Sequence, residues 1–323
     1  MTGMAQGLAP RVGEPDHAAA TGLQQDLLLR ATFAAPLDVF DLPPAETAAE
    51  SYRSAKPYPH LVVDGFFKPE IFRSLQQELV PGKANFRQVF TDEFQKNKTI
   101  STGDAVPPLI SLLAAKFAAP QMLRYLERVT GLKRLIPDPY YNTDYGYYHI
   151  VGSGGVLGSH VDHSRHNTLN VPHVLNIVVY LTDNWDPRDG GALCLYDGTG
   201  RDIVTRVTCD ANRAVIFACT PAAFHGVEPI TETSGRRRHS LYFAYYSVEA
   251  LPPAGPELFP GVGLPASNLD PDANYSTYFV VPFHQLFRRR NWIHLRTRLI
   301  YLANLLLPPI LVRAAKRARR ALR

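Results

Sequence analysis

The stretch Ser159-His160-Val161-Asp162-His163-Ser164 decides how the rest of this 323-residue sequence is interpreted. On an extended segment, residues two apart point to the same side, so the side chains of His160 and Asp162 are expected on one face. An imidazole and a carboxylate on one face can share a metal ion. The pair is weak evidence by itself, because a chain with 11 His and 29 Asp and Glu contains such spacings by chance.

A third candidate ligand is His225, which follows an apolar run typical of a buried strand. With His160 and Asp162 it would complete a 2-His-1-carboxylate face with open coordination positions, the pattern typical of non-haem Fe(II) sites. His163 and His166 are the near alternatives to His160, which we prefer for its spacing to the acid.

A second polar face is expected on the aromatic-rich strand 238–247, where alternation puts Arg238 and Ser240 on the same side. Burying an arginine is costly without a partner. A cosubstrate with a carboxylate, held by both arms of the guanidinium, would be such a partner. Arg236 and Arg237 compete for this role, but they precede the strand and are expected at the surface.

With these residues identified, the sequence resembles the 2-oxoglutarate/Fe(II)-dependent dioxygenases and, within them, the prolyl 4-hydroxylase-like branch. The resemblance extends to a strand ending in Tyr180-Leu181, a turn at Trp185, the pair Gly190-Gly191 and a following strand. It covers residues 57–247, and the two ends of the chain lie outside it.

The resemblance implies that His160, Asp162 and His225 bind Fe(II). Three protein ligands leave three coordination positions, two for a chelating 2-oxoglutarate and one for O2. Family members that halogenate have a small residue where this chain has Asp162, so the carboxylate favours hydroxylation or a related oxidation. In this family L-ascorbate commonly keeps the iron reduced, and we expect the same here.

The cosubstrate pocket is expected around Arg238, which would hold the distal carboxylate of 2-oxoglutarate. Tyr180 is its expected hydroxyl partner, because the matching tyrosine of the family faces the cosubstrate. Asn176, Ser240 and His149 are further candidates for the pocket, for which a structural role is equally consistent with the sequence.

The fold class follows from the short apolar segments between Tyr147 and Ser247. We expect about eight strands, at 147–151, 156–163, 174–182, 192–196, 203–207, 213–219, 225–229 and 238–247. Strands of this length and spacing are typical of a sandwich or jelly roll. The resemblance implies a double-stranded β-helix, so we predict a mostly β, α+β fold with flanking helices, in a dioxygenase domain over residues 57–250.

Helices are predicted before this core. Apolar spacing, and proline at the first turn of most of them, place them at 45–55, from Pro69 onward, at 109–117 and at 120–130. The polar segment 83–105 is interpreted as a solvated loop, and a mobile segment that covers the substrate is the sharper alternative.

Three segments outside the core are interpreted from composition. Residues 1–56 are predicted to be disordered with short helices, 251–282 to be irregular and rich in proline, and 283–323 to be a basic amphipathic helical tail. The tail contains eleven Lys and Arg and no acidic residue, which leaves 23 basic residues (34 − 11) against 29 acidic ones in the rest.

The tail has three open interpretations. Its apolar run 299–312 contains Pro308-Pro309 and is too short to span a membrane. The tail could therefore pack on the body or on a second subunit, contact anionic lipid at a membrane surface, or bind nucleic acid without specificity. No specific nucleic-acid partner is expected.

Cysteine content bears on location. Cys194, Cys209 and Cys219 are odd in number and form no Cys-x-x-Cys, which favours free thiols in a reducing compartment. The first 20 residues lack the apolar segment of a secretory signal. We expect a cytoplasmic protein, with peripheral membrane contact through the tail as the alternative.

The predicted function is hydroxylation of an unactivated C–H bond by a 2-oxoglutarate-dependent Fe(II) dioxygenase, with succinate and CO2 as co-products. The alternatives are a related oxidation, such as cyclisation or desaturation, and a catalytically silent jelly-roll binding protein. The substrate, a small molecule or a protein side chain, cannot be chosen by analogy of fold.

Overall fold

The computed structural model describes residues 37–79, 87–90, 95–101, 106–139, 147–249 and 277–280. The whole basic tail and most of the N-terminal and proline-rich segments lie outside these ranges, so what the sequence predicts for them stays a prediction. No helix of the described ranges is long and apolar enough to cross a membrane.

The helices form where the sequence predicts them. They are α2 (Ala45–Ser54), α3 (Pro69–Glu78), α4 (Pro108–Phe117) and α5 (Pro120–Thr130). The last three begin with proline, whose backbone angle already suits a helix and whose missing N–H is not needed there. Gly131 ends α5 in a left-handed conformation with φ 78°.

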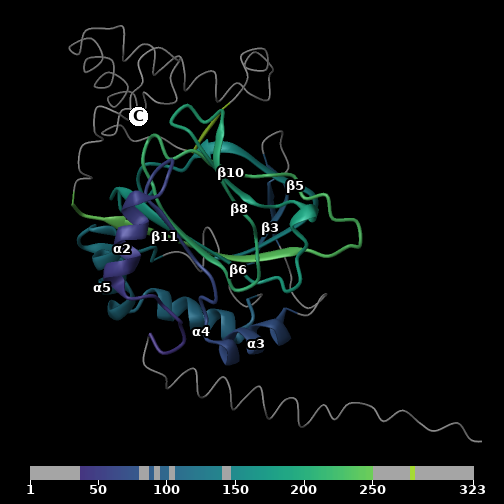
Figure 1. Cartoon of the computed structure of the whole chain (residues 1–323), viewed down its shortest axis with the longest axis horizontal. Coiled ribbons are helices and arrows are strands. Elements are labelled where there is room, and N and C mark those ends of the chain that lie inside the picture. Colours follow the sequence, from purple (N-terminus) through teal and green to yellow (C-terminus); the bar gives the residue numbers. More distant parts are fainter. Residues whose placement is uncertain are drawn as a thin grey trace, which may run out of the picture.

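The strands are mostly antiparallel and form a half-barrel. They are β1 (His60–Val63), β2 (Arg87–Phe90), β3 (Gln95–Ser101), β4 (Leu135–Pro137), β5 (Tyr148–Val161), β6 (His173–Tyr180), β7 (Leu193–Tyr196), β8 (Ile203–Val207), β9 (Ala214–Ala218), β10 (His225–Val227), β11 (Arg238–Ser247) and β12 (Tyr278–Phe279), with a 3-10 turn η3 (Pro187–Asp189) before β7. Figure 1 shows the strands curving into a half-barrel, with the helices along one side.

Two layers of four strands make up the core of this half-barrel. One layer has the order β9-β6-β11-β5 and the other β5-β10-β7-β8. The two layers share β5, because its first half pairs with β11 and its second half with β10. This order is consistent with the predicted jelly roll.

The shared strand β5 corrects one prediction. The sequence predicts separate strands at 147–151 and 156–163, whereas β5 runs without interruption from Tyr148 to Val161. Glycines let it bend between the layers: Gly154 has φ 71°, and a Cβ on Gly155 would lie 2.2 Å from Cγ1 of Val151. The bend directs the second half of β5 toward β10, and the strand continues through it.

The predicted solvated loop at 83–105 is wrong for its described residues. There β2 and β3 form a hairpin, and β3 extends the sheet along the edge of β5. The strand β3 lies between β2 and β5, and its polar composition fits a strand near the edge of a sheet with one face in solvent. A bulge interrupts its pairing at Asn97, which has φ 50° and donates from Nδ2 to the Ser153 carbonyl, 2.7 Å away.

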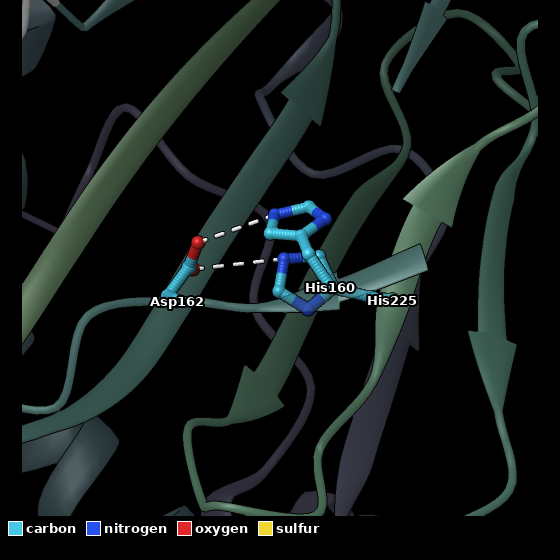
Figure 2. A group of neighbouring side chains, drawn as sticks. All are labelled: His160, Asp162 and His225. Atoms are coloured by element: carbon cyan, nitrogen blue, oxygen red, sulfur yellow. Dashed lines mark ion pairs between the residues drawn. The ribbon is translucent and has the colours of Figure 1, made fainter. Parts of the chain in front are cut away.

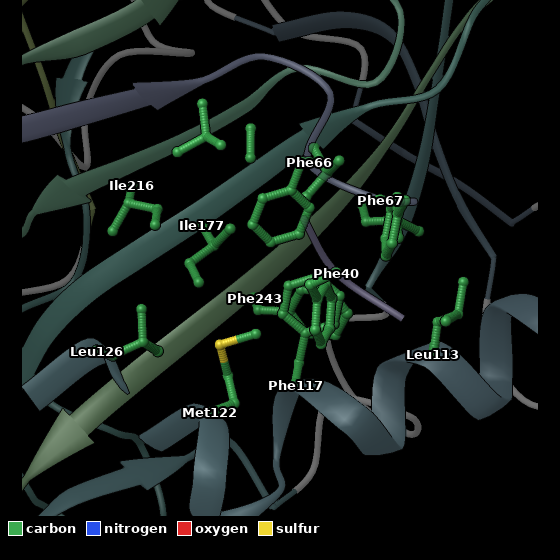
Figure 3. Packing of buried hydrophobic residues seen from close by; sticks show 14 of the residues in the cluster. Phe40, Phe66, Phe67, Leu113, Phe117, Met122, Leu126, Ile177, Ile216 and Phe243 are labelled. Atoms are coloured by element: carbon green, nitrogen blue, oxygen red, sulfur yellow. The ribbon is translucent and has the colours of Figure 1, made fainter. Parts of the chain in front are cut away.

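The main core lies between the helices and the β9-β6-β11 layer. Its centre is aromatic: the rings of Phe117 and Phe243 stack with centroids 4.0 Å apart, and Phe40, Phe66 and Phe67 pack beside them (Figure 3). Along β11, residues 241, 243 and 245 enter this core, while the alternate residues face the opposite side of the sheet. That opposite side holds the site.

Candidate active site

Three side chains predicted as metal ligands lie together at one end of the half-barrel. His160 is near the end of β5, Asp162 follows the strand, and His225 begins β10 as the cross-strand partner of His160. Nε2 of His160 lies 3.3 Å from Oδ1 of Asp162, and Nε2 of His225 lies 3.6 Å from Oδ2 (Figure 2). All three ligand atoms lie within 4.8 Å of one another, a spacing that one ion can bridge.

Backbone carbonyls orient both imidazole rings. Nδ1 of His160 hydrogen-bonds the Gly158 carbonyl at 2.8 Å, and Nδ1 of His225 the Ala223 carbonyl at 3.1 Å. Since a carbonyl only accepts, each Nδ1 carries a proton, and each Nε2 faces Asp162 as the atom that would bind a metal ion. Burial, helped by the neighbouring His160, lowers the pKa of His225 to about 4, so its ring is neutral as a ligand must be.

The carboxylate of Asp162 is held from behind by Asn176 on β6. Nδ2 of Asn176 donates to Oδ2 of Asp162 at 2.7 Å, and its Oδ1 accepts from Nε2 of His173 at 2.8 Å. Burial opposes the charge of Asp162, but His225 and His160 outweigh burial and hold its pKa well below the usual range. The site therefore presents a charged carboxylate beside two imidazoles.

Asn176 therefore has a different place from the one predicted. The sequence left a cosubstrate contact and a structural role equally open for it, and it is not among the residues that line the cavity described below. Alternation put it on the correct face of β6, and Asp162 stands between it and the open space. We reassign it as a residue that positions Asp162.

A cavity of about 230 Å³ opens beside these ligands, between the two layers. Its wall is largely apolar, with Val151, Val178, Leu193 and Phe217 among the lining residues. Four residues predicted for the cosubstrate pocket line it: His149, Tyr180, Arg238 and Ser240.

Arg238 is the buried cation of this cavity. Its side chain is only 5% exposed, Nη1 donates to the Gly191 carbonyl at 2.6 Å, and the guanidinium lies 5.5 Å from the centre of the Tyr180 ring. Nε is buried and has no hydrogen-bond partner among the described residues. An unsatisfied donor on a buried cation suits a carboxylate ligand, so the residues fit 2-oxoglutarate.

The competing arginines lie elsewhere. Arg236 donates to the Asp183 and Asn184 carbonyls and lies over the Trp185 ring at 5.7 Å, at the surface. Arg237 is also exposed.

Cross-strand rows explain how the rest of the pocket is assembled. Ser240 on β11 is the direct partner of His149 on one side and of Tyr180 on the other. Directly opposed residues of a sheet point to the same face, so all three reach the cavity. The ring of His149 also stacks on Tyr242 at 5.4 Å between centroids.

The alternative histidines make other contacts. Nε2 of His163 hydrogen-bonds the Tyr246 hydroxyl at 3.0 Å, and Nε2 of His166 lies 3.4 Å from Oδ1 of Asp138. Neither belongs to a ligand cluster of the described residues.

Sequence reasoning missed one nearby cluster and one cation. His173 and Cys219 form a second group with Asp162 and do not line the cavity, and burial raises the pKa of the Cys219 thiol. Lys98 on β3 lines the cavity. Its only sequence signal is alternation with Ile100, which becomes visible once 95–101 is taken as a strand.

Comparison with known proteins identifies a family over part of the chain. Residues 145–246 match the family model described as the 2OG-Fe(II) oxygenase superfamily. Over these residues the match confirms the predicted resemblance to 2-oxoglutarate/Fe(II) oxygenases, which are oxidoreductases. No curated protein matches the chain.

Solved structures of this kind are similar at low identity. A prolyl-4-hydroxylase from Pseudomonas putida is 15% identical, with a TM-score of 0.43, over 62% of this chain and 99% of its own. A prolyl hydroxylase from Trichoplax adhaerens, solved with a hypoxia inducible factor peptide fragment, is 14% identical, with a TM-score of 0.42. The match covers 73% of this chain and 94% of the Trichoplax chain. HygX from Streptomyces hygroscopicus, solved with iron bound, is 16% identical, with a TM-score of 0.38. The match covers 58% of this chain and 82% of the HygX chain.

Proposed function

From this family match we propose that the chain is a 2-oxoglutarate- and Fe(II)-dependent dioxygenase that hydroxylates an unactivated C–H bond. His160, Asp162 and His225 would hold the iron. The convergence of their ligand atoms within 4.8 Å is the observation that carries the proposal. When bound, iron and 2-oxoglutarate supply the oxidation of the C–H bond by O2, with succinate and CO2 as co-products.

The residues of the chain would contribute orientation and charge. Arg238 would bind the distal carboxylate of 2-oxoglutarate, with the Tyr180 hydroxyl beside it. Burial raises the pKa of Tyr180, so its hydroxyl stays protonated and can donate to a carboxylate. Ser240, the cross-strand neighbour of Tyr180, is a second hydroxyl on the same wall.

The apolar wall would keep water away from the reacting groups. Val178, Leu193 and Phe217 offer no hydrogen bonds to solvent and enclose the space beside the ligands. A dry pocket strengthens the contact of Arg238 with a carboxylate and limits side reactions.

Turnover without substrate tests the proposal. The full chain with Fe(II) and 2-oxoglutarate should form succinate slowly, L-ascorbate should sustain the reaction, and His225→Ala should abolish it. Arg236→Met is the matched control, because Arg236 lies at the surface, and it should behave as wild type. Binding of both ligands with no succinate at all would instead support a silent binding protein.

We infer a cytoplasmic enzyme whose basic tail, 283–323, is dispensable for the iron chemistry. Liposome co-sedimentation of the full chain and of a chain ending near Pro282 tests membrane contact. If neither pellets with anionic vesicles at low salt, packing or dimerisation is left. An unfolded or insoluble truncated chain would show that the tail belongs to the core.

A further inference from the structure

Lys98 lies in the same cross-strand row as Arg238. Lys98 on β3 is the direct partner of Val151 on β5, and Val151 is the direct partner of Arg238 on β11. All three side chains therefore point to one face, and all three line the cavity. The bulge at Asn97, anchored to Ser153, sets this orientation of Lys98.

The ammonium of Lys98 has no partner in the part of the chain that the structure describes. It makes no hydrogen bond and no ion pair with any residue of the described ranges, although the side chain is half-buried at the cavity wall. Burial lowers the pKa of Lys98 to about 8, with Asp162 opposing this effect and Arg238 adding to it. The ammonium thus stands within electrostatic reach of both residues and is mostly charged at neutral pH.

The charges of the proposed iron and cosubstrate site balance without Lys98. Fe(II) carries two positive charges and Arg238 carries one. Asp162 carries one negative charge and 2-oxoglutarate carries two, so the three positive and three negative charges cancel. Lys98 then adds one further positive charge to a partly buried wall. Such a charge is costly unless an anion accompanies it.

Among the described residues that line the cavity, the acidic one besides Asp162 is Asp138, and it lies too far away to be that anion. The backbone N–H of Asp138 bonds the Ala244 carbonyl, six residues along β11 from Arg238. At about 3.4 Å per residue this is roughly 20 Å of strand, beyond the reach of a direct ion pair between the two side chains. Its carboxylate instead faces His166.

The size of the cavity limits what the anion can be. At about 230 Å³ the cavity lies below the range of roughly 300–1,000 Å³ that is usual for ligand pockets. After 2-oxoglutarate has entered, only a small molecule or one extended side chain fits beside the metal ligands.

We propose that Lys98 recognises the carboxylate of a small anionic substrate, such as a free amino acid or another small organic acid. This inference rests on the proposed function, because the charge balance assumes iron and 2-oxoglutarate in the site. It goes beyond that function by naming the class of substrate and the residue that selects it.

The test uses propionate and its neutral isostere propionamide as probes of the full chain loaded with Mn(II) and 2-oxoglutarate. Broadening of the probe's methyl proton signal reports binding close to the metal. For wild type we expect propionate to bind at least about tenfold more tightly than propionamide, the size of one charge-assisted hydrogen bond.

Variants separate Lys98 from its surroundings. Lys98→Met should remove the preference for propionate while the Kd for 2-oxoglutarate stays within about twofold, and Lys98→Arg should keep the preference. Lys96→Met is the matched control, because Lys96 is exposed on the same strand, and it should behave as wild type.

Two results would overturn the inference. One is equal binding of propionate and propionamide to the loaded wild type. The other is a Lys98→Met variant that loses 2-oxoglutarate and keeps the preference for propionate, since Lys98 would then belong to the cosubstrate. A wild type that takes up neither Mn(II) nor 2-oxoglutarate contradicts the proposed function itself, so the two failures are distinguishable.

Discussion

The side-chain amide of Asn176 donates to Oδ2 of Asp162 at 2.7 Å, across the boundary between the two layers of strands. Asn176 belongs to β6, whereas Asp162 follows β5. The bond aims the carboxylate at the two imidazoles, and His173 in turn orients the amide. Ligand geometry therefore depends on contacts that do not touch the cavity.

Removing this contact should weaken metal binding without unfolding the chain. For Asn176→Ala we expect a 10- to 100-fold loss of Mn(II) or Fe(II) affinity, as is usual for partners of metal ligands. Tyr242→Phe, whose hydroxyl is a long 3.4 Å from Oδ2 of Asp162, should lose less. Titration of each variant with Mn(II) and with Fe(II) measures these affinities. Equal affinities for wild type and Asn176→Ala would refute the positioning role.

Substituting any proposed ligand should abolish metal uptake. His160→Ala and His225→Ala each remove one imidazole ligand, and Asp162→Ala removes the carboxylate of the three. Equilibrium dialysis followed by metal analysis measures the stoichiometry. Asp162→Ala should abolish hydroxylation, and at best the vacated position would accept a halide ion. Full activity in any of the three variants would contradict the ligand assignment.

Arg238→Met should separate cosubstrate binding from metal binding. It leaves a buried carboxylate of 2-oxoglutarate unpaired, which costs about 2–5 kcal/mol. The Kd for 2-oxoglutarate should rise accordingly, while Mn(II) affinity is retained. Arg236→Met and Arg237→Met are the controls, because both side chains are exposed. The assignment fails if a control loses 2-oxoglutarate and Arg238→Met does not.

Acid should destabilise the metal-free protein between about pH 6.5 and 4. Burial is the main cause that lowers the pKa of His163, His225 and His239 to about 4, whereas an unfolded histidine titrates near 6.5. In this window the unfolded chain binds protons that the folded chain does not, so stability is lost as pH falls. The contribution of Asp162 is lost only below this window, because its pKa is lowered as well.

Urea denaturation with a chelator present, at pH 7 and pH 5, measures this effect. Each unit of pKa difference corresponds to about 1.4 kcal/mol. His239→Gln, remote from the metal ligands, should make the pH dependence shallower whatever its effect on absolute stability. Equal unfolding free energies at the two pH values would contradict the prediction.

Gly190→Ala should destabilise the fold beside the Arg238 anchor. Gly190 has φ 75° and ψ −154°, a region that only glycine occupies readily, and a Cβ would lie 2.1 Å from the Pro229 carbonyl oxygen. We expect a loss of about 2–5 kcal/mol in thermal or urea denaturation. Gly65→Ala is the control: its φ of 65° is unfavourable but nothing lies within 4 Å, so about 1 kcal/mol is expected. Equal losses would show that the contact with Pro229 is unimportant.

Local patterns predicted most of the half-barrel. Alternation with period two placed Arg238, Ser240 and Tyr180 on the cavity face, and proline and glycine marked the helix ends. These signals lie within a few residues of the feature that they predict.

Features that depend on distant partners were harder to predict. The strand at 95–101 exists because it pairs with β5, some fifty residues later, and its polar sequence resembles a loop until that partner is known. Alternation likewise gave the face of Asn176 but not its neighbour Asp162, which comes from another strand. Lys98 was missed because the segment that carries it resembles a loop in sequence.

The direct pairing of His160 with His225 ties the site to a single alignment of two strands. Sliding β10 along β5 by one residue would turn one imidazole to the opposite face of the sheet and leave two ligands. An ion bound by all three side chains would stabilise only the correct alignment, since mispaired strands would not bind it. The metal would thus select the correct strand pairing during folding, before it takes part in any chemistry.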